Sequence, residues 1–98
     1  MNKLLGAGAL ALALSTCMPH QSRWERIAHC ESGSQWNHPQ VHNRYGTFSG
    51  GLMIMNSAWR QYGGLAFAPY AGAATKAQQI TVAERIWNRV GAKAWQCK

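Results

Sequence analysis

The sequence contains no aspartate, and its only acidic side chains are three glutamates, Glu25, Glu31 and Glu84. It also lacks a paired-cysteine motif, and the proline between His38 and His42 prevents these two residues from pairing as ligands on one helix face. We therefore expect neither a metal site nor a cofactor. Both histidines are instead predicted to be solvated loop residues.

Basic residues outnumber acidic ones but form no dense run. The ten Lys and Arg residues give a formal net charge of +7 and are spread along the chain. No nucleic-acid-binding motif accompanies them, so we expect no nucleic acid partner. Neither long predicted helix has the strongly basic amphipathic face of a membrane-active peptide. A basic chain of this kind suits a polyanionic partner such as a cell wall or an anionic lipid surface.

The one long apolar run is too short to span a membrane as a stable anchor. Residues 1–16 combine Lys3 with an apolar run over residues 4–14, a pattern typical of a secretory signal peptide. Residues 21–98 are then predicted to form one domain of a secreted or cell-wall-associated protein. We expect this protein to be a monomer.

Cys17 directly follows the predicted signal peptide. Residues 14–17 resemble a lipobox, in which the cysteine carries a lipid anchor, although Thr16 departs from the Gly, Ala or Ser usual before that cysteine. Three alternatives stay open for Cys17: lipidation, a free thiol beside the cleavage site, and removal with the signal peptide.

A domain of this size has a marginal hydrophobic core, so a covalent cross-link would help to hold it. Cys30 and Cys97 stand near the two ends of the domain and are the expected pair. Export permits a disulfide, and closing a loop of that length stabilises by about 4 kcal/mol on the chain-entropy model.

A helix is predicted over residues 22–33. Ser22 and Glu25 have the spacing of a capping box, which predicts that the helix begins at Ser22. Gly33 is expected to end it, because glycine readily adopts the left-handed conformation found after helices.

The phase of this helix turns one carboxylate inward. Trp24, Ile27 and Ala28 form an apolar face. At 100° per residue, Glu31 lies roughly 10° from the middle of that face, whereas Glu25 lies about 110° from it. Burial and the negative end of the helix dipole both disfavour the charged form, so we expect a raised pKa for Glu31. Carboxyl groups in such positions are usually functional.

Other elements are predicted further along the chain. The polar, turn-rich residues 35–49 fit short extended pieces or a hairpin. Asn56 is expected to cap a short helix that ends before two glycines. Thr75 and Gln78 form another capping box, opening a helix that ends at Gly91. The predicted buried face of this helix comprises Ile80, Ala83, Ile86, Trp87 and Val90.

Motifs in several parts of the chain, in order, carry a family resemblance: residues 24–33, the turn Gly50-Gly51-Leu52, Trp59 with Tyr62-Gly63-Gly64, residues 79–85, and Trp95-x-Cys97. Together they resemble the catalytic domain of the resuscitation-promoting factors. These are secreted, lysozyme-like proteins of actinobacteria and their phages that cleave peptidoglycan. The resemblance covers nearly the whole predicted domain. Residues 51–55 also resemble a Gly-Leu-Met-Gln-Ile segment of the lytic transglycosylases.

The resemblance implies a mainly α (α+β) fold: a compact lysozyme-like domain with a short or vestigial β segment and one disulfide, Cys30 to Cys97. It implies glycan strands of peptidoglycan as the partner and Glu31 as the catalytic acid, which is the residue that helical phase also selects. The chain departs from the family at one place. Both families have a glutamine just after the Gly-Leu pair, where this sequence has Met53 and Ile54. This bears on substrate affinity or subsite preference more than on the chemistry.

We expect a sugar-binding cleft near Glu31, with these candidate residues: Trp36, Arg44, Tyr45, Phe48, Gly51 and Met53. The aromatic rings would line the cleft, and Arg44 would meet carboxylates of the lactyl group or the peptide. Each has an ordinary alternative: the aromatic residues fill the core, and the arginine is solvated. The glycine gives room either for a ligand or for a neighbouring helix.

Two functions of this fold stay open, namely glycan cleavage and glycan binding without cleavage. For cleavage, Glu25 and Glu84 are both predicted to point away from the apolar faces, which leaves Glu31 without a second carboxylate. A single Glu can donate a proton and then act as base on the substrate's own C6 hydroxyl. That route gives a 1,6-anhydro sugar, whereas attack by water gives plain hydrolysis.

Overall fold

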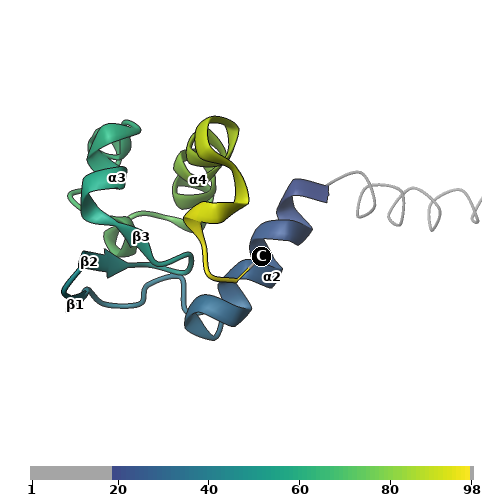
Figure 1. Cartoon of the computed structure of the whole chain (residues 1–98), viewed down its shortest axis with the longest axis horizontal. Coiled ribbons are helices and arrows are strands. Elements are labelled where there is room, and N and C mark those ends of the chain that lie inside the picture. Colours follow the sequence, from purple (N-terminus) through teal and green to yellow (C-terminus); the bar gives the residue numbers. More distant parts are fainter. Residues whose placement is uncertain (1–18, 98) are drawn as a thin grey trace, which may run out of the picture.

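The computed structural model describes residues 19–97. The predicted signal peptide and the predicted lipidation site at Cys17 lie outside these described residues. Within these residues there are three α-helices and a small sheet: α2 (Pro19–Ser32), β1 (Val41–Asn43), β2 (Gly46–Ser49), β3 (Ile54–Met55), α3 (Asn56–Gln61) and α4 (Lys76–Val90). Short 3₁₀ helices occupy Gly64–Ala66, Ala71–Ala73 and Gly91–Ala94. In Figure 1 the sheet lies below α3, and the C-terminal tail returns to α2.

Helix α2 starts earlier than predicted. It already includes Pro19, so Ser22 lies inside the helix and does not cap it. Proline fits the first turn of a helix and serine is tolerated within one, so the capping-box spacing alone was not decisive. The predicted end is confirmed. Gly33 has φ 68°, and its N–H donates to the carbonyl of His29 at 3.0 Å, as in an αL helix end.

The apolar face of α2 packs into the core as predicted. Trp24, Ile27 and Ala28 are all buried. Trp24 makes edge-to-face contacts with Trp87 and Trp95, at centroid distances of 5.5 and 5.0 Å. Such pairs stabilise by about 0.5–1.5 kcal/mol beyond the area that they bury. Rings from α2, α4 and the C-terminal tail therefore pack against one another, with the α4 ring of Trp87 only partly buried.

Helix α4 begins as predicted, with a complete capping box between Thr75 and Gln78. Its predicted buried face is only partly right, because Val90 is 37% exposed. Val90 is the last residue of α4, so no further turn of the helix covers it. Gln79 and Val82, which the prediction left out, are buried.

Helix α3 lacks the predicted cap. Met55 is the N-cap residue, no side chain caps the helix, and Asn56 is the first helical residue. The Asn56 amide Nδ2 instead donates to Gln40 Oε1 at 2.9 Å. A tertiary contact has therefore replaced the local one. The helix ends where expected, since its C-cap Tyr62 precedes Gly63 with φ 85°.

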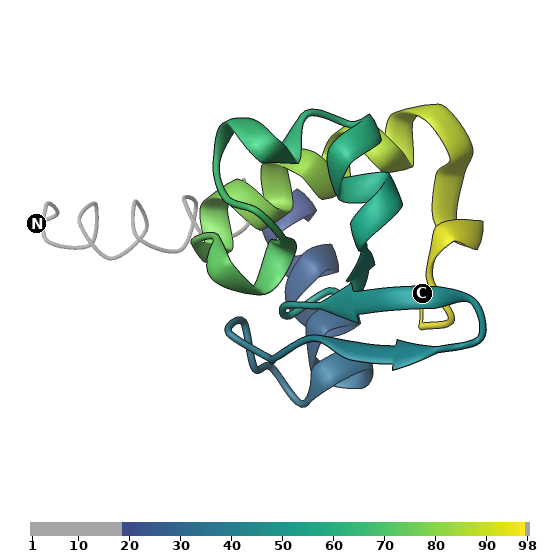
Figure 2. The same ribbon diagram turned by 90° about the vertical axis from the view of Figure 1, so that its left-hand side faces the viewer.

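The three strands form one antiparallel sheet in the order β1-β2-β3. Strands β1 and β2 make a hairpin that pairs Val41 with Phe48. At its turn the N–H of Tyr45 donates to Asn43 Oδ1 at 2.8 Å. Figure 2 shows this hairpin extending along the domain below α3 and α4. The expected lysozyme-like α+β fold with a small β segment is confirmed.

The predicted disulfide is also confirmed. Cys30 and Cys97 are bonded, with their Cα atoms 5.9 Å apart. The bond ties the C-terminal tail to the last turn of α2. Within residues 19–97 no helix is long and apolar enough to cross a membrane. The same residues contain no cluster of three or more His, Cys, Asp or Glu side chains that could hold a metal ion.

Candidate active site

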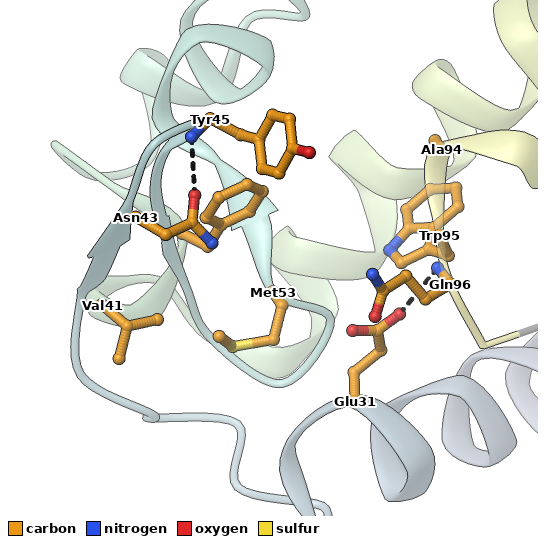
Figure 3. A pocket seen from close by; sticks show the side chains of 9 residues that line it. Glu31, Val41, Asn43, Tyr45, Met53, Ala94, Trp95 and Gln96 are labelled. Carbon is orange, nitrogen blue, oxygen red and sulfur yellow. Dashed lines mark hydrogen bonds between the residues drawn. The ribbon is translucent and has the colours of Figure 1, made fainter.

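A cavity of about 360 Å³ opens beside the last turn of α2. One wall comes from the hairpin and the other from the C-terminal tail, with Met53 and Glu31 between them (Figure 3). The lining residues are Glu31, Val41, Asn43, Tyr45, Phe48, Met53, Ala94, Trp95 and Gln96.

Glu31 reaches this cavity from the end of α2, as the helical phase predicted. Its side chain is partly buried. Its Oε2 atom accepts two backbone hydrogen bonds, from the N–H groups of Gln96 and Cys97, each at 3.1 Å. Figure 3 shows the other carboxyl oxygen turned away from the tail, toward the side of Met53. One oxygen is thus held by the protein while the other faces the cavity.

The other two carboxylates lie elsewhere. Glu25 is 53% exposed and forms an ion pair with Lys76 Nζ at 2.7 Å. Glu84 Oε2 accepts a hydrogen bond from Trp24 Nε1 at 2.8 Å. Neither of them lines the cavity. Because the chain has no Asp, Glu31 is the one carboxylate among the cavity-lining residues that the structure describes.

Three of the predicted substrate-binding residues, Tyr45, Phe48 and Met53, line the same cavity as Glu31. Tyr45 stands at the hairpin turn with 67% of its surface exposed. Arg44 lies beside the cavity but is not part of its lining. Its Nη2 donates to the hydroxyl of Tyr45 at 2.9 Å, and its guanidinium carbon is 5.0 Å from the centre of that ring. The pair holds an exposed ring next to a cation.

The other two do not line the cavity: Trp36 is partly buried, Gly51 is buried, and the two pack against each other. A Cβ atom on Gly51 would come within 2.5 Å of Trp36 Cε3. The N–H of Gly51 donates to Gln79 Oε1 at 2.9 Å, and the carbonyl of Trp36 accepts from Gln79 Nε2 at 2.7 Å. Of the two alternatives for Gly51, the contacts are those of close packing against Trp36.

Five lining residues were not among the predicted ones: Val41, Asn43, Ala94, Trp95 and Gln96. For the tail residues a signal was available. The expected disulfide joins the neighbour of Glu31 to the residue after Gln96, so it must bring the tail to the carboxylate. Trp95 is buried, and its Nε1 donates to the carbonyl of Leu52 at 2.9 Å. For Val41 and Asn43 no local pattern revealed how the hairpin would fold back over α2.

The cavity continues into a second, mostly apolar one of about 200 Å³. The two share four residues, and the second extends between α3 and α4, lined by Phe48, Met53, Ile54, Met55, Ala58, Ile86, Ala94 and Trp95. Met53 lines both cavities and has φ 48°, a left-handed conformation that is uncommon outside glycine. The two joined cavities are called the groove below. Met53 and Ile54, which stand where the family has its glutamine, both give this groove apolar surface.

Comparison with known proteins shows the family to which the chain belongs. A family model described as a transglycosylase-like domain matches residues 18–98. The chain is 43% identical over 90 residues to the resuscitation-promoting factor Rpf1 of Corynebacterium glutamicum, in a match covering 92% of the chain and 45% of Rpf1. The chain belongs to the resuscitation-promoting factor family.

Other members of the family are similar to a comparable extent. The resuscitation-promoting factor RpfA of Mycobacterium tuberculosis is 37% identical over 92 residues, covering 94% of the chain and 22% of RpfA. The factor RpfC of the same species is 32% identical over 93 residues, covering 92% of the chain and 61% of RpfC. The chain thus spans less than half of Rpf1 and about a fifth of RpfA.

Proposed function

We propose that this domain cleaves the glycan strands of peptidoglycan, with Glu31 as its single acid and base. The observation that carries the proposal is the isolated carboxylate of Glu31 at the wall of a cavity of about 360 Å³. Membership of a transglycosylase-like family supports the same class of reaction. The protein would then act outside the cell, as a secreted or cell-wall-associated protein, with no metal or cofactor in the reaction.

In the first step the protonated Glu31 gives its proton to the glycosidic oxygen as the bond to the sugar breaks. The oxygen that faces the cavity is the one placed to donate. The negative charge left on Glu31 is met by the N–H groups of Gln96 and Cys97, which already point at Oε2. Donors that are fixed before the reaction stabilise developing charge without reorganising.

In the second step the same carboxylate acts as base. Ordinary glycosidases use two carboxylates, and their separation decides the stereochemical outcome. Here Glu25 and Glu84 are engaged away from the cavity, so no second carboxylate is at hand. Glu31 can take the proton of the substrate's C6 hydroxyl, which attacks the anomeric carbon within the same sugar. Intramolecular attack benefits from proximity, and its product is a 1,6-anhydro sugar.

The groove offers suitable surfaces for such a strand. Tyr45 and Phe48 present aromatic rings near Glu31, and sugar rings pack well on such faces. Arg44 is beside them and can meet a carboxylate of the lactyl group or the stem peptide. Trp36 and Gly51, in contrast, would not contact the glycan. Their role would be to fix the loop that carries Met53.

Met53 favours a second candidate function, namely glycan binding without cleavage. With Met53 and Ile54 lining the groove, amide hydrogen bonds to sugar are replaced by apolar contact. A domain that binds glycan without cutting it would tolerate this change. An intact Glu31 in the cavity weighs against that alternative.

The proposal is tested by incubating the protein with purified peptidoglycan and analysing the soluble products by mass spectrometry. Release of fragments that end in 1,6-anhydro sugars is the expected result. Fragments that are all heavier by one water, with reducing ends, would show a hydrolase that uses water in the second step. Binding to the wall with no soluble fragment would show the non-catalytic alternative.

A further inference from the structure

We infer that the disulfide-bound C-terminal tail positions the Glu31 carboxyl for proton transfer, through the backbone N–H groups of Gln96 and Cys97. The inference rests on the proposed function of Glu31. It gives the Cys30–Cys97 bond a second role besides stabilising the fold. The tail would fix which oxygen of Glu31 carries the proton and would hold that oxygen toward the cavity.

The covalent connection brings donors and acceptor to one place. Cys30 immediately precedes Glu31, and Cys97 immediately follows Gln96, so the S–S bond joins the carboxylate's helix to both donors. Both N–H groups converge on the same oxygen, Oε2, at the same distance of 3.1 Å. On the other side of the donors, Trp95 is fixed by burial and by its hydrogen bond to the Leu52 carbonyl. The donors are therefore held from both ends.

The arrangement has a definite consequence for the proton. Two N–H groups fill the acceptor positions of Oε2, so a hydroxyl hydrogen on that atom would point at other hydrogens. The proton of the neutral acid therefore sits on Oε1, the oxygen that Figure 3 shows turned away from the tail. After the proton leaves, hydrogen bonds to a charged oxygen are roughly twice as strong as those to a neutral one. The tail thus favours a proton on Oε1 before the transfer and stabilises the charged carboxylate after it.

A pair of variants at position 96 isolates one of the two donors. Gln96→Pro removes the side chain and the N–H, because proline has no backbone donor. Gln96→Ala removes the side chain and keeps the N–H. A proline at this position is compatible with the preceding residue, since Trp95 is extended, with φ −121° and ψ 145°. The ratio of the two variants therefore measures the loss of the N–H group together with the fixed φ of proline, without any contribution from the glutamine side chain.

The measurement is the steady-state rate on soluble, uncross-linked peptidoglycan strands. We expect kcat of Gln96→Pro to be about tenfold or more below that of Gln96→Ala, since hydrogen bonds to charged groups are strong. The KM values of the two should agree within about twofold, because the donor touches Glu31 and no substrate atom. Equal kcat values in two folded variants would overturn the inference. A difference confined to KM would overturn it as well.

A second comparison covers the case in which Gln96→Pro fails to fold. The double variant Cys30→Ser with Cys97→Ser keeps both N–H groups but frees the tail from α2. Assayed below its unfolding temperature, it should show a lower kcat with KM within about twofold of the wild type. Its amides at 96 and 97 should also exchange with deuterium faster than those of the wild type. Full kcat together with fast exchange at these amides would contradict a positioning role.

Amide exchange also separates this inference from the proposed function. In Glu31→Ala, which lacks the acceptor, exchange at Gln96 and Cys97 should be faster than in the wild type. If exchange responds in this way but the wild type releases no glycan, the proposed function fails while the contact stands. If the wild type releases glycan and the exchange rates at these amides are the same in Glu31→Ala as in the wild type, the positioning inference fails.

Discussion

Glu31 and Ser32 are consecutive residues at the end of α2, yet they face two very different surroundings. Ser32 is 8% exposed; its Oγ is 3.1 Å from the Ala28 carbonyl oxygen and 2.9 Å from that of Gly51. It also accepts the N–H of Gln35 at 3.0 Å. Glu31 borders a cavity, and the hydrogen bonds to its carboxyl group leave one oxygen facing open space.

We call the first surrounding the packed junction, defined as Ser32, Trp36, Gly51 and Gln79. Its polar groups bond to one another or to nearby backbone, and Gly51 is in contact with the Trp36 ring. Buried polar groups that are fully bonded make a structure rigid. The cavity has an accessible carboxylate and the exposed ring of Tyr45 instead. The difference places a region that stabilises the fold and a region that we propose for chemistry within a single helical turn. Changes in the packed junction should therefore lower the stability of the fold. Changes at the cavity should lower glycan release and leave stability nearly unchanged.

The largest expected effect on stability is in the packed junction, at Gln79. Gln79→Leu keeps the size of the side chain but removes the partners of the Gly51 N–H and of the Trp36 and Ala74 carbonyls. Unpaired buried groups are destabilising by about 1–3 kcal/mol each, so the free energy of unfolding should fall by about 3 kcal/mol or more. Urea denaturation measures this.

Gln61→Leu is the matched control for Gln79→Leu, because Gln61 is exposed on α3. It should change the free energy of unfolding by less than about 0.5 kcal/mol. If Gln79→Leu were no more destabilising than this control, the packed junction would not have the role given to it.

A smaller loss of stability is expected for Gly51→Ala. The added methyl group would meet the Trp36 ring at 2.5 Å, and overpacking of this kind is destabilising by about 1–3 kcal/mol. The melting temperature should fall accordingly. In a Trp36→Leu background the same substitution should lower it less, because the clashing ring is gone. An equal drop in both backgrounds would show that some other contact of Gly51 is responsible.

The smallest expected effect is on substrate binding at the hairpin. Tyr45 is largely exposed, so Tyr45→Ala should leave the melting temperature nearly unchanged. Loss of an aromatic contact with sugar should reduce glycan release at low substrate concentration by about two- to tenfold. Phe67→Ala removes another exposed ring that does not line the cavity and should leave release unaltered. Equal rates for both variants would remove Tyr45 from the binding surface.

The sequence alone predicted those features that depend on local geometry. Helical phase oriented Glu31, the Thr75–Gln78 box opened α4, and Gly33 ended α2. These positions are determined by residues within one or two turns, so a pattern of spacing is enough to find them. The Cys30–Cys97 pair was predictable because the domain is small and the two cysteines stand near its ends.

The errors concern positions where tertiary contacts or neighbouring turns decide. Ser22 has the spacing of a cap but lies within a longer helix, and Asn56 bonds to Gln40 in place of capping α3. Trp36 was a plausible cleft residue by type, yet its ring packs on Gly51. Only the three-dimensional fold determines which of two aromatic residues near the end of α2 faces the cavity. No spacing rule contains that information.

The central claim, that Glu31 is the only acid and base of this domain, is tested most directly by glycan release from purified peptidoglycan. The comparison is between Glu31→Gln and Glu25→Gln, both checked for folding by their melting curves. We predict that Glu31→Gln is slower than the wild type by a factor of about 10² to 10⁴ or more, as expected for loss of general acid–base catalysis. Glu25→Gln should retain activity, because Glu25 is paired with Lys76 outside the cavity. Substantial glycan release by folded Glu31→Gln protein would contradict the account.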